Sequence, residues 1–248
     1  SIGQILLANT SKEDLDEVLF DVVNHINMGK ELVEEQTLRY HFAELNKKAG
    51  KKAKKAIAFE SAFSYFKTAI EYLGQDTWNS NYNLTFDLYK EYAETAYLTT
   101  HFEESDTAFS LILNHAKTDL EKTEIYVMQI RQFENLGKFQ EAVDAGLKGL
   151  DLLGINFPEK EVEQEQLLHT ELQSINSKMT VEQIDSLIDL PLMENQEMKA
   201  AVRLLTGLDI PCQWIGKMKL AQICNATTVR ISLEHGNMEE SPLGYMAH

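Results

Sequence analysis

Apolar residues recur every three or four positions along most of the chain. This spacing places them on one face of a helix, with polar residues on the opposite face. The first clear case is a set of five positions: Leu15, Val18, Leu19, Val22 and Ile26. No segment shows a convincing alternation of apolar and polar residues, which would mark a strand, and proline is absent before residue 158. The pattern therefore predicts an all-α fold.

Three helical hairpins are expected between residues 34 and 157. The second helix of each hairpin begins with a phenylalanine at an equivalent place: Phe59, Phe102 and Phe139. These residues are 43 and 37 positions apart, within the range of helical-hairpin repeats. A single hairpin cannot bury its own apolar face, whereas stacked neighbours can. The spacing therefore predicts a solenoid of helical-hairpin repeats.

Small and aromatic residues in these hairpins resemble those of the tetratricopeptide repeat. The matching positions of the first hairpin are "AG" at 49–50, Ala62, Phe66 and Ala69. The third hairpin keeps the central turn as "LGKFQEA" at 136–142, but carries Gly146 where the others carry phenylalanine. Ile57 and Thr100 stand where a turn glycine is usual, so the repeats are degenerate. The resemblance implies a right-handed superhelix whose concave face often binds a partner.

Six lysines fall within residues 47–55 of an otherwise acidic chain, whose formal net charge is −16. They are Lys47, Lys48, Lys51, Lys52, Lys54 and Lys55. On a helix they occupy an arc separate from the small residues Ala49 and Ala53, so amphipathicity alone predicts a solvent-exposed face. A positive patch in a negative field also fits a docking face for an acidic partner or a neighbouring acidic domain. The sequence leaves both interpretations open.

Four aromatic residues follow Asp76, which is expected to cap one helix reaching Ala96. They are Trp78, Tyr82, Tyr89 and Tyr92, at helical spacing. This spacing favours packing between hairpins, and an aromatic peptide-binding groove is the alternative.

Residues 158–248 are expected to form further helical hairpins, truncated at the C-terminus. The expected helices are residues 161–177, 180–188, 194–210 and 213–234. Pro211 is predicted to break the chain between the last two, because proline lacks the N–H that a helix interior needs.

The sequence contains no catalytic constellation. The phosphate-binding P-loop, the protein-kinase motifs and the zinc motif H-E-x-x-H are all absent. None of the seven histidines has the surroundings of a histidine-kinase phosphoacceptor. Cys212 and Cys224 flank an apolar helix, as core residues do. We therefore expect no enzyme activity, cofactor or metal site in this segment.

Composition limits the class of protein and its expected location. The fractions of hydrophobic residues (44%) and charged residues (25%) are those of soluble globular proteins. No stretch approaches the roughly 18 uncharged apolar residues of a membrane helix, and the first residues do not resemble a signal peptide. Two cysteines form no disulfide framework, so a cytoplasmic location is expected. The acidic balance argues against nucleic acid as a partner.

The order of segments resembles the helical region of large multi-domain signalling kinases. The resembling segments include "IGQILLANTS", "ELNKKAGKKAKKAIAFESAFSYFKTAIEYL", "GLKGLDLLGINFPE" and "RISLEHGNMEESPLGY". In that family a kinase-like or sensor part and an AAA-type (STAND-like) ATPase precede the helices. GAF or PAS sensors and a histidine kinase follow them.

The resemblance implies three regions and a function. Residues 1–33 would be N-terminal helices continuing from an upstream ATPase, residues 34–157 the three hairpins, and residues 158–248 the later hairpins. The expected function is a non-catalytic scaffold that contacts flanking domains of its own polypeptide or another protein during signal transduction. The alternative is a free-standing tetratricopeptide-type adaptor that binds peptides.

Overall fold

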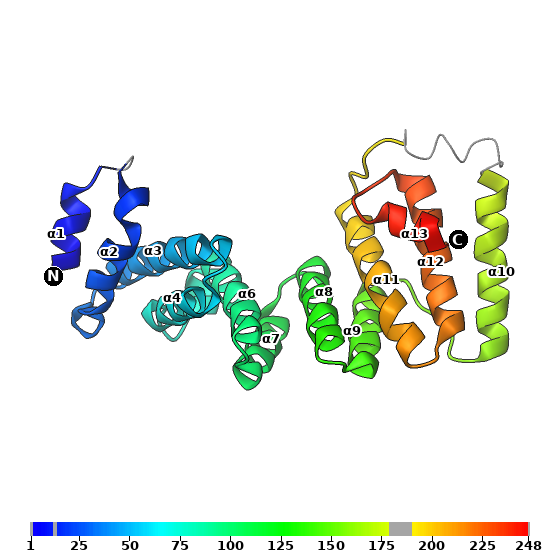
Figure 1. Ribbon diagram of the computed structural model, residues 1–248, viewed down its shortest axis with the longest axis horizontal. Helices are drawn as coiled ribbons and strands as arrows, with labels where there is room; N and C mark the ends of the chain where they lie inside the picture. Colours follow the sequence, from blue (N-terminus) through cyan, green and yellow to red (C-terminus); the bar gives the residue numbers. More distant parts are fainter. Residues whose placement is uncertain (1, 12–13, 179–189, 248) are drawn as a thin grey trace. The chain divides into compact units, whose positions relative to one another are not determined.

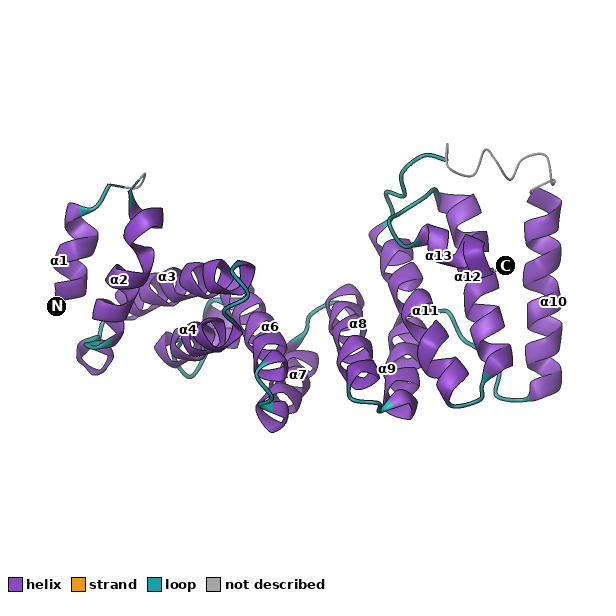
Figure 2. Cartoon of the chain, in the orientation of Figure 1, coloured by secondary structure: helices purple, strands orange, loops and turns teal. Residues whose placement is uncertain are grey.

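The structure, a computed structural model, describes residues 2–11, 14–178 and 190–247, with side chains through residue 245. This part of the chain is helical and contains no strand (Figure 2). Its one piece of β-structure is an isolated bridge between Leu192 and Asn237. The predicted all-α fold class is confirmed. The chain divides into two units, Ser1–Ala116 and Lys117–His248, which are described separately below.

The first unit is a series of helices in which α1, α2, α3, α4, α6 and α7 pack in chain order, and the short α5 packs against α6 (Figure 1). Its helices are α1 (Ile2–Asn9), α2 (Leu15–Asn27), the 3₁₀ turn η1 (Lys30–Leu32), α3 (Gln36–Lys55), α4 (Phe59–Tyr72), α5 (Thr77–Ser80), α6 (Tyr82–Leu98) and α7 (Phe102–His115). Helices α3 and α4 form one hairpin, α6 and α7 form another, and α4 packs against α6 between them.

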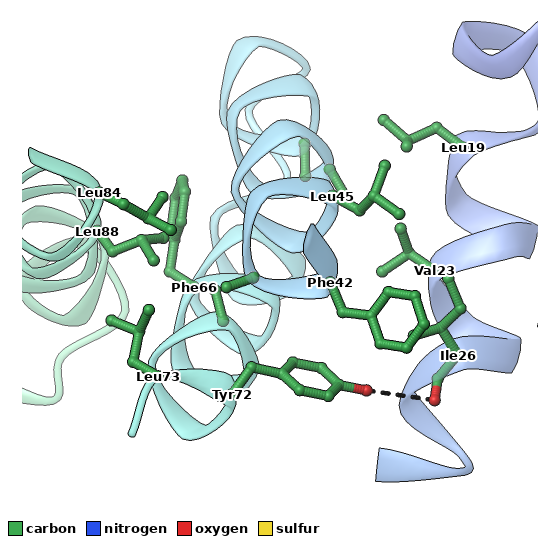
Figure 3. Close-up of a cluster of buried hydrophobic side chains, with 14 of the residues drawn as sticks. Leu19, Val23, Ile26, Phe42, Leu45, Phe66, Tyr72, Leu73, Leu84 and Leu88 are labelled. Atoms are coloured by element: carbon green, nitrogen blue, oxygen red, sulfur yellow. Dashed lines mark hydrogen bonds between the residues drawn. The ribbon is translucent and has the colours of Figure 1, made fainter. Parts of the chain in front are cut away.

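The core of this unit follows from the apolar faces of α2, α3, α4 and α6. Figure 3 shows Leu19, Val23 and Ile26 of α2 facing Phe42 and Leu45 of α3. The completely buried Tyr72 of α4 closes the same cluster, and its hydroxyl donates a hydrogen bond of 3.3 Å to the carbonyl of Ile26. Burying an aromatic side chain of this size is a large favourable term, and the hydrogen bond satisfies its polar end.

Within its described residues, the second unit contains two hairpins and two additional helices. Its helices are α8 (Asp119–Asn135), α9 (Phe139–Leu152), α10 (Glu161–Lys178), α11 (Gln196–Trp214), α12 (Met218–His235) and α13 (Ser241–Ala247). Helix α11 packs against both α8 and α9, and α12 packs against α11. Helix α10 lies against α12 (Figure 1). Ile175 of α10 packs there with Ala226 and Val229 of α12. The helix expected at 180–188 lies outside the described residues.

The α11–α12 hairpin has the same turn as the three expected hairpins, an equivalence that was not predicted. The four turns each place one residue at positive φ: Ile57 (61°), Thr100 (65°), Gly137 (69°) and Gly216 (76°). In each turn the next residue donates its N–H to a carbonyl five positions back, as in Lys138 to Phe133 (2.8 Å) and Lys217 to Cys212 (2.8 Å). These bonds satisfy carbonyls that a helix end would otherwise leave unpaired.

Two predicted helix boundaries were wrong. Pro211 does not end its helix, because α11 continues to Trp214 with Pro211 inside it. Proline removes one backbone hydrogen bond here, but Pro211 and Cys212 are both buried, and burial of this last turn offsets the loss. The helix expected from Asp76 to Ala96 is interrupted at Asn81, whose φ of −147° lies outside the helical region.

Close helix contacts explain why Gly146 replaces the phenylalanine of the other hairpins. A Cβ at Gly146 would lie 2.8 Å from Cγ of Leu208, so the bare backbone of α9 makes room for this α11 side chain. Gly149, one turn later, gives Leu204 the same room, since a Cβ there would lie 2.8 Å from its Cδ1. In the first hairpin the ring of Phe66 itself packs on the partner helix, over Gly50 of α3.

Candidate functional site

The lysine-rich face of α3 lies at the C-terminal end of the helix, where the opposite face has small side chains. Ala49, Gly50 and Ala53 are buried against the neighbouring helix. A Cβ at Gly50 would lie 2.6 Å from the Phe66 ring, so α3 and α4 are in close contact. The longer lysine side chains therefore lie on the outer arc, between α2 and α6.

Three of the lysines reach carboxylates of α6. Lys47 is 2.7 Å from Asp87, and Lys51 is 3.5 Å from Glu91. Lys54 contacts both Glu91 (2.8 Å) and Glu94 (2.6 Å). Burial opposes the charge on Lys54, but its bonds to Glu91 and Glu94 outweigh burial and raise its pKa. Lys54 is therefore held in its charged form.

Two further lysines reach α2. The ammonium groups of Lys48 and Lys52 lie 3.3 Å and 3.4 Å from the carboxylate of Asp16, and Lys52 also donates to the main-chain carbonyl of Asp16. Hydrogen bonds from Lys48 and Lys52 lower the pKa of Asp16. The Lys52 ammonium also sits 5.4 Å from the ring centre of Phe20, at cation–π distance.

The lysine-rich face therefore joins three helices of its own chain. Five of the six lysines contact carboxylates of α2 or α6, whereas Lys55 has no such partner within the described residues. Each exposed pair of this kind contributes little alone, on the order of 0.2–1 kcal/mol, but several pairs fix the position of α3. Docking of a partner on this face stays a prediction, with Lys55 its least engaged residue.

The aromatic residues after Asp76 pack between helices and also border a hollow. Trp78 stacks on Tyr89 at 5.3 Å and on His115 at 4.5 Å. Tyr92 stacks on Phe63 at 5.3 Å and donates its hydroxyl hydrogen to Glu104. Both interpretations of this aromatic set therefore have a counterpart in the structure.

The hollow is a groove of about 500 Å³ between α4, α6 and α7, called the α4–α6–α7 groove below. It is lined by Lys67, Ile70 and Glu71 of α4, Tyr89 and Tyr92 of α6, and Glu103, Glu104, Thr107, Ala108 and Leu111 of α7. Its volume falls within the usual range of ligand-binding pockets, roughly 300–1,000 Å³. An aromatic groove was the alternative interpretation of the sequence, and Tyr89 and Tyr92 of that set line this one. Its walls on α4 and α7 were not predicted, because folding brings the three helices together.

Electrostatics keep one wall of this groove negative. Hydrogen bonds from Tyr92 and from Lys67, whose ammonium is 3.1 Å from Glu104, lower the pKa of the Glu104 carboxyl. Burial and the bond to Glu104 raise the pKa of the Tyr92 hydroxyl, which keeps its proton. Glu104 is thus a fixed negative charge and Tyr92 a fixed donor.

The two cysteines lie in the core of the second unit. Both are buried, and burial raises the pKa of the Cys212 thiol to about 12. Burial also raises the pKa of Cys224 well above its usual value. Both side chains are therefore held as thiols, the less nucleophilic form.

Within residues 2–11, 14–178 and 190–247, no group of three or more His, Cys, Asp or Glu side chains is arranged to hold a metal ion. Among the helices described here, none is both long and apolar enough to cross a membrane.

Sequence comparison finds a distant relative among signalling proteins. The chain is 28% identical over 146 residues to hybrid signal transduction histidine kinase G of Dictyostelium discoideum. The similarity covers 55% of this chain but only 4% of that protein. No protein-family model matches the chain, and no solved structure matches it significantly.

Proposed function

We propose that this segment is a non-catalytic helical scaffold of a larger signalling protein, where it makes contacts between domains or with other proteins. The observation that carries the proposal is the turn shared by four hairpins, two in each unit. Such a turn is a common way for a helix to end. Its recurrence between the paired helices of four hairpins is what stacked helical repeats would show, and such repeats offer extended binding surfaces. We include the tetratricopeptide-like character of the hairpins in the proposal.

The signalling part of the proposal rests on the distant relative. That protein is named as a hybrid signal transduction histidine kinase, and the similar region is a small fraction of its length. A helical segment that occupies a small fraction of a large kinase fits a connecting or regulatory part better than its catalytic centre. We extend this to a multi-domain parent with an ATPase module before the helices and sensor and histidine-kinase modules after them.

A peptide-binding adaptor is the second candidate. The α4–α6–α7 groove favours it, because an aromatic-lined hollow on a helical stack is suited to a short segment of another protein. The two candidates differ in the identity of the partner: a neighbouring domain of the same polypeptide, or a separate protein.

The transcript that encodes this segment distinguishes the two candidates. We expect its reading frame to continue into an ATPase module upstream and into sensor and histidine-kinase modules downstream. A reading frame that encodes helical hairpins alone would refute the kinase context and leave the adaptor as the better account.

A further inference from the structure

We propose that the α4–α6–α7 groove binds a basic peptide segment, with an apolar side chain of the peptide inside the groove and adjacent Lys or Arg side chains on its carboxylates. This inference rests on the proposed scaffold function and names the class of partner that the scaffold takes. The groove lies within the first unit, away from the lysine-rich contacts of α3 with α2.

The apolar part of the argument comes from the groove lining. Ile70, Tyr89, Tyr92 and Leu111 are half-buried, so part of each side chain faces the hollow. Apolar atoms that line a hollow gain free energy when a matching side chain displaces water from them. Tyr89 is held in place by its stack on Trp78, so this wall is already formed before a ligand arrives.

The charge of the groove selects the sign of the partner. Three carboxylates line it, those of Glu71, Glu103 and Glu104, against one ammonium, that of Lys67. Glu71 is paired with Lys30, 2.5 Å away and outside the lining. Lys67 is already bound to Glu104, and Glu103 is exposed with no basic partner in the described part of the chain. Glu103 is therefore available to a positive side chain of a ligand.

The net charge of the whole chain also favours a basic partner. The formal net charge of −16 steers basic partners toward the protein and repels acidic ones. The dense lysines of α3 do not reverse this at the groove, because most of them are engaged with carboxylates of α2 and α6. An acidic peptide would meet repulsion both at long range and at the groove itself.

Binding is tested on the intact 248-residue chain by fluorescence anisotropy. The probe is a fluorescein-labelled peptide of twelve residues in which leucine and arginine alternate. Two matched peptides carry glutamate in place of arginine, or serine in place of leucine. We expect saturable binding of the first peptide, which weakens as salt is raised, and at least about tenfold weaker binding of the other two.

Charge at the groove is tested with Glu103→Lys. Glu60 is its matched control, because it occupies the same first-turn position of α4 that Glu103 occupies of α7, is equally exposed and lies outside the groove. We expect Glu103→Lys to weaken binding about fivefold or more, and Glu60→Lys to change it by less than about twofold.

The apolar hollow is tested with Thr107→Phe, which fills it from an exposed position on α7. Ser110→Phe adds the same ring to an exposed position on the same helix outside the groove lining. We expect at least about tenfold weaker binding for Thr107→Phe alone. Circular dichroism checks that all four variants keep the helical content of the parent chain.

Three results would overturn the inference. They are equal binding of the glutamate peptide, equal effects of the groove variants and their controls, and no binding of the arginine peptide. None of these outcomes bears on the reading frame of the transcript. Peptide binding at the groove can therefore be refuted while the kinase context is confirmed, and the kinase context can be refuted while peptide binding is confirmed.

Discussion

Replacing Gly146 with alanine tests how closely the fourth hairpin (α11–α12) packs on the third (α8–α9). Gly146 lies on α9, where an added Cβ would meet Leu208 of α11, 2.8 Å from its Cγ and closer still to its Cδ2. Both of these Leu208 atoms disappear in Leu208→Ala. The remaining neighbour is Cδ1 of Ile130, 3.1 Å from the added Cβ and at the end of a flexible side chain. The same glycine substitution is therefore expected to have opposite effects in the two backgrounds.

The magnitudes follow from two opposing terms. Forcing an extra methyl group into a packed core costs about 1–3 kcal/mol, while replacing glycine by alanine within a helix gains about 1 kcal/mol. Gly146→Ala alone should then lower the free energy of unfolding by about 0–2 kcal/mol. In the Leu208→Ala background, itself destabilised by about 2–5 kcal/mol, the same change should raise the free energy of unfolding by about 1 kcal/mol.

The assay uses the two tryptophans of the chain, one in each unit. Trp78→Phe leaves Trp214 of α11 as the fluorescent reporter of the second unit. Guanidinium unfolding of the parent, the two single variants and the double variant then gives the coupling free energy between positions 146 and 208.

A coupling near zero would refute the close contact of α9 with α11. Such a result would mean that Gly146 has open space over it, and that the fourth hairpin does not pack on the third as described. A coupling of about 1–3 kcal/mol, with the sign change described above, is the expected result.

Three further predictions concern the turns, the core and the thiols. Ile57→Gly should raise the free energy of unfolding by roughly 0.5–1 kcal/mol, because Ile57 is at positive φ and 74% exposed. Gly137→Ala, at the equivalent turn position, should lower it. Chemical denaturation measures both changes. Burial raises the pKa of Tyr72 to about 12, so this side chain ionises at lower pH in the unfolded chain than in the folded chain. The free energy of unfolding should therefore fall as pH rises from 10 toward 12. Unfolding curves at several pH values should show a shallower fall for Tyr72→Phe. Cys212 and Cys224 should resist a thiol reagent in the folded chain and react fully in denaturant, and fast reaction of the folded chain would contradict their burial.

The helices and their pairing were largely predictable from local patterns. The spacing of Phe59, Phe102 and Phe139 marks positions where second helices begin in the structure, because apolar periodicity and turn chemistry act within a few residues. The turn residues Ile57 and Thr100 keep the glycine-like backbone even without glycine. Here the contacts of the whole hairpin outweigh the local cost of a left-handed residue.

Helices close to α11 and α12 were predicted, but the equivalence of their hairpin to the other three was missed, although its turn carries a readable signal. The segment "IGKM" at 215–218 resembles "LGKF" at 136–139, and both glycines have positive φ. Pro211 obscured it, because a proline usually ends a helix, whereas here it lies in the buried last turn of α11. The long stretch between the third and fourth hairpins, which includes α10, also hid the regular spacing.

The candidate site was predictable only in part. The lysines of α3 and their amphipathic arc are visible in the sequence, but their partners are not. Lys47 and Lys54 meet Asp87 and Glu94, each 40 positions away, and Lys52 meets Asp16 at a separation of 36. Ion pairs of this length depend on which helices become neighbours, so only the folded chain identifies them.

The most direct test of the central claim, that this segment contacts other protein modules, is site-specific photo-cross-linking in the native full-length protein. A photoreactive residue is placed at Thr107 in the α4–α6–α7 groove, with position 110 as the matched control on the same helix. The account predicts that position 107 cross-links to a basic segment of another module or protein, and that position 110 does so much less. Equal yields at the two positions, or no cross-link from either, would contradict it.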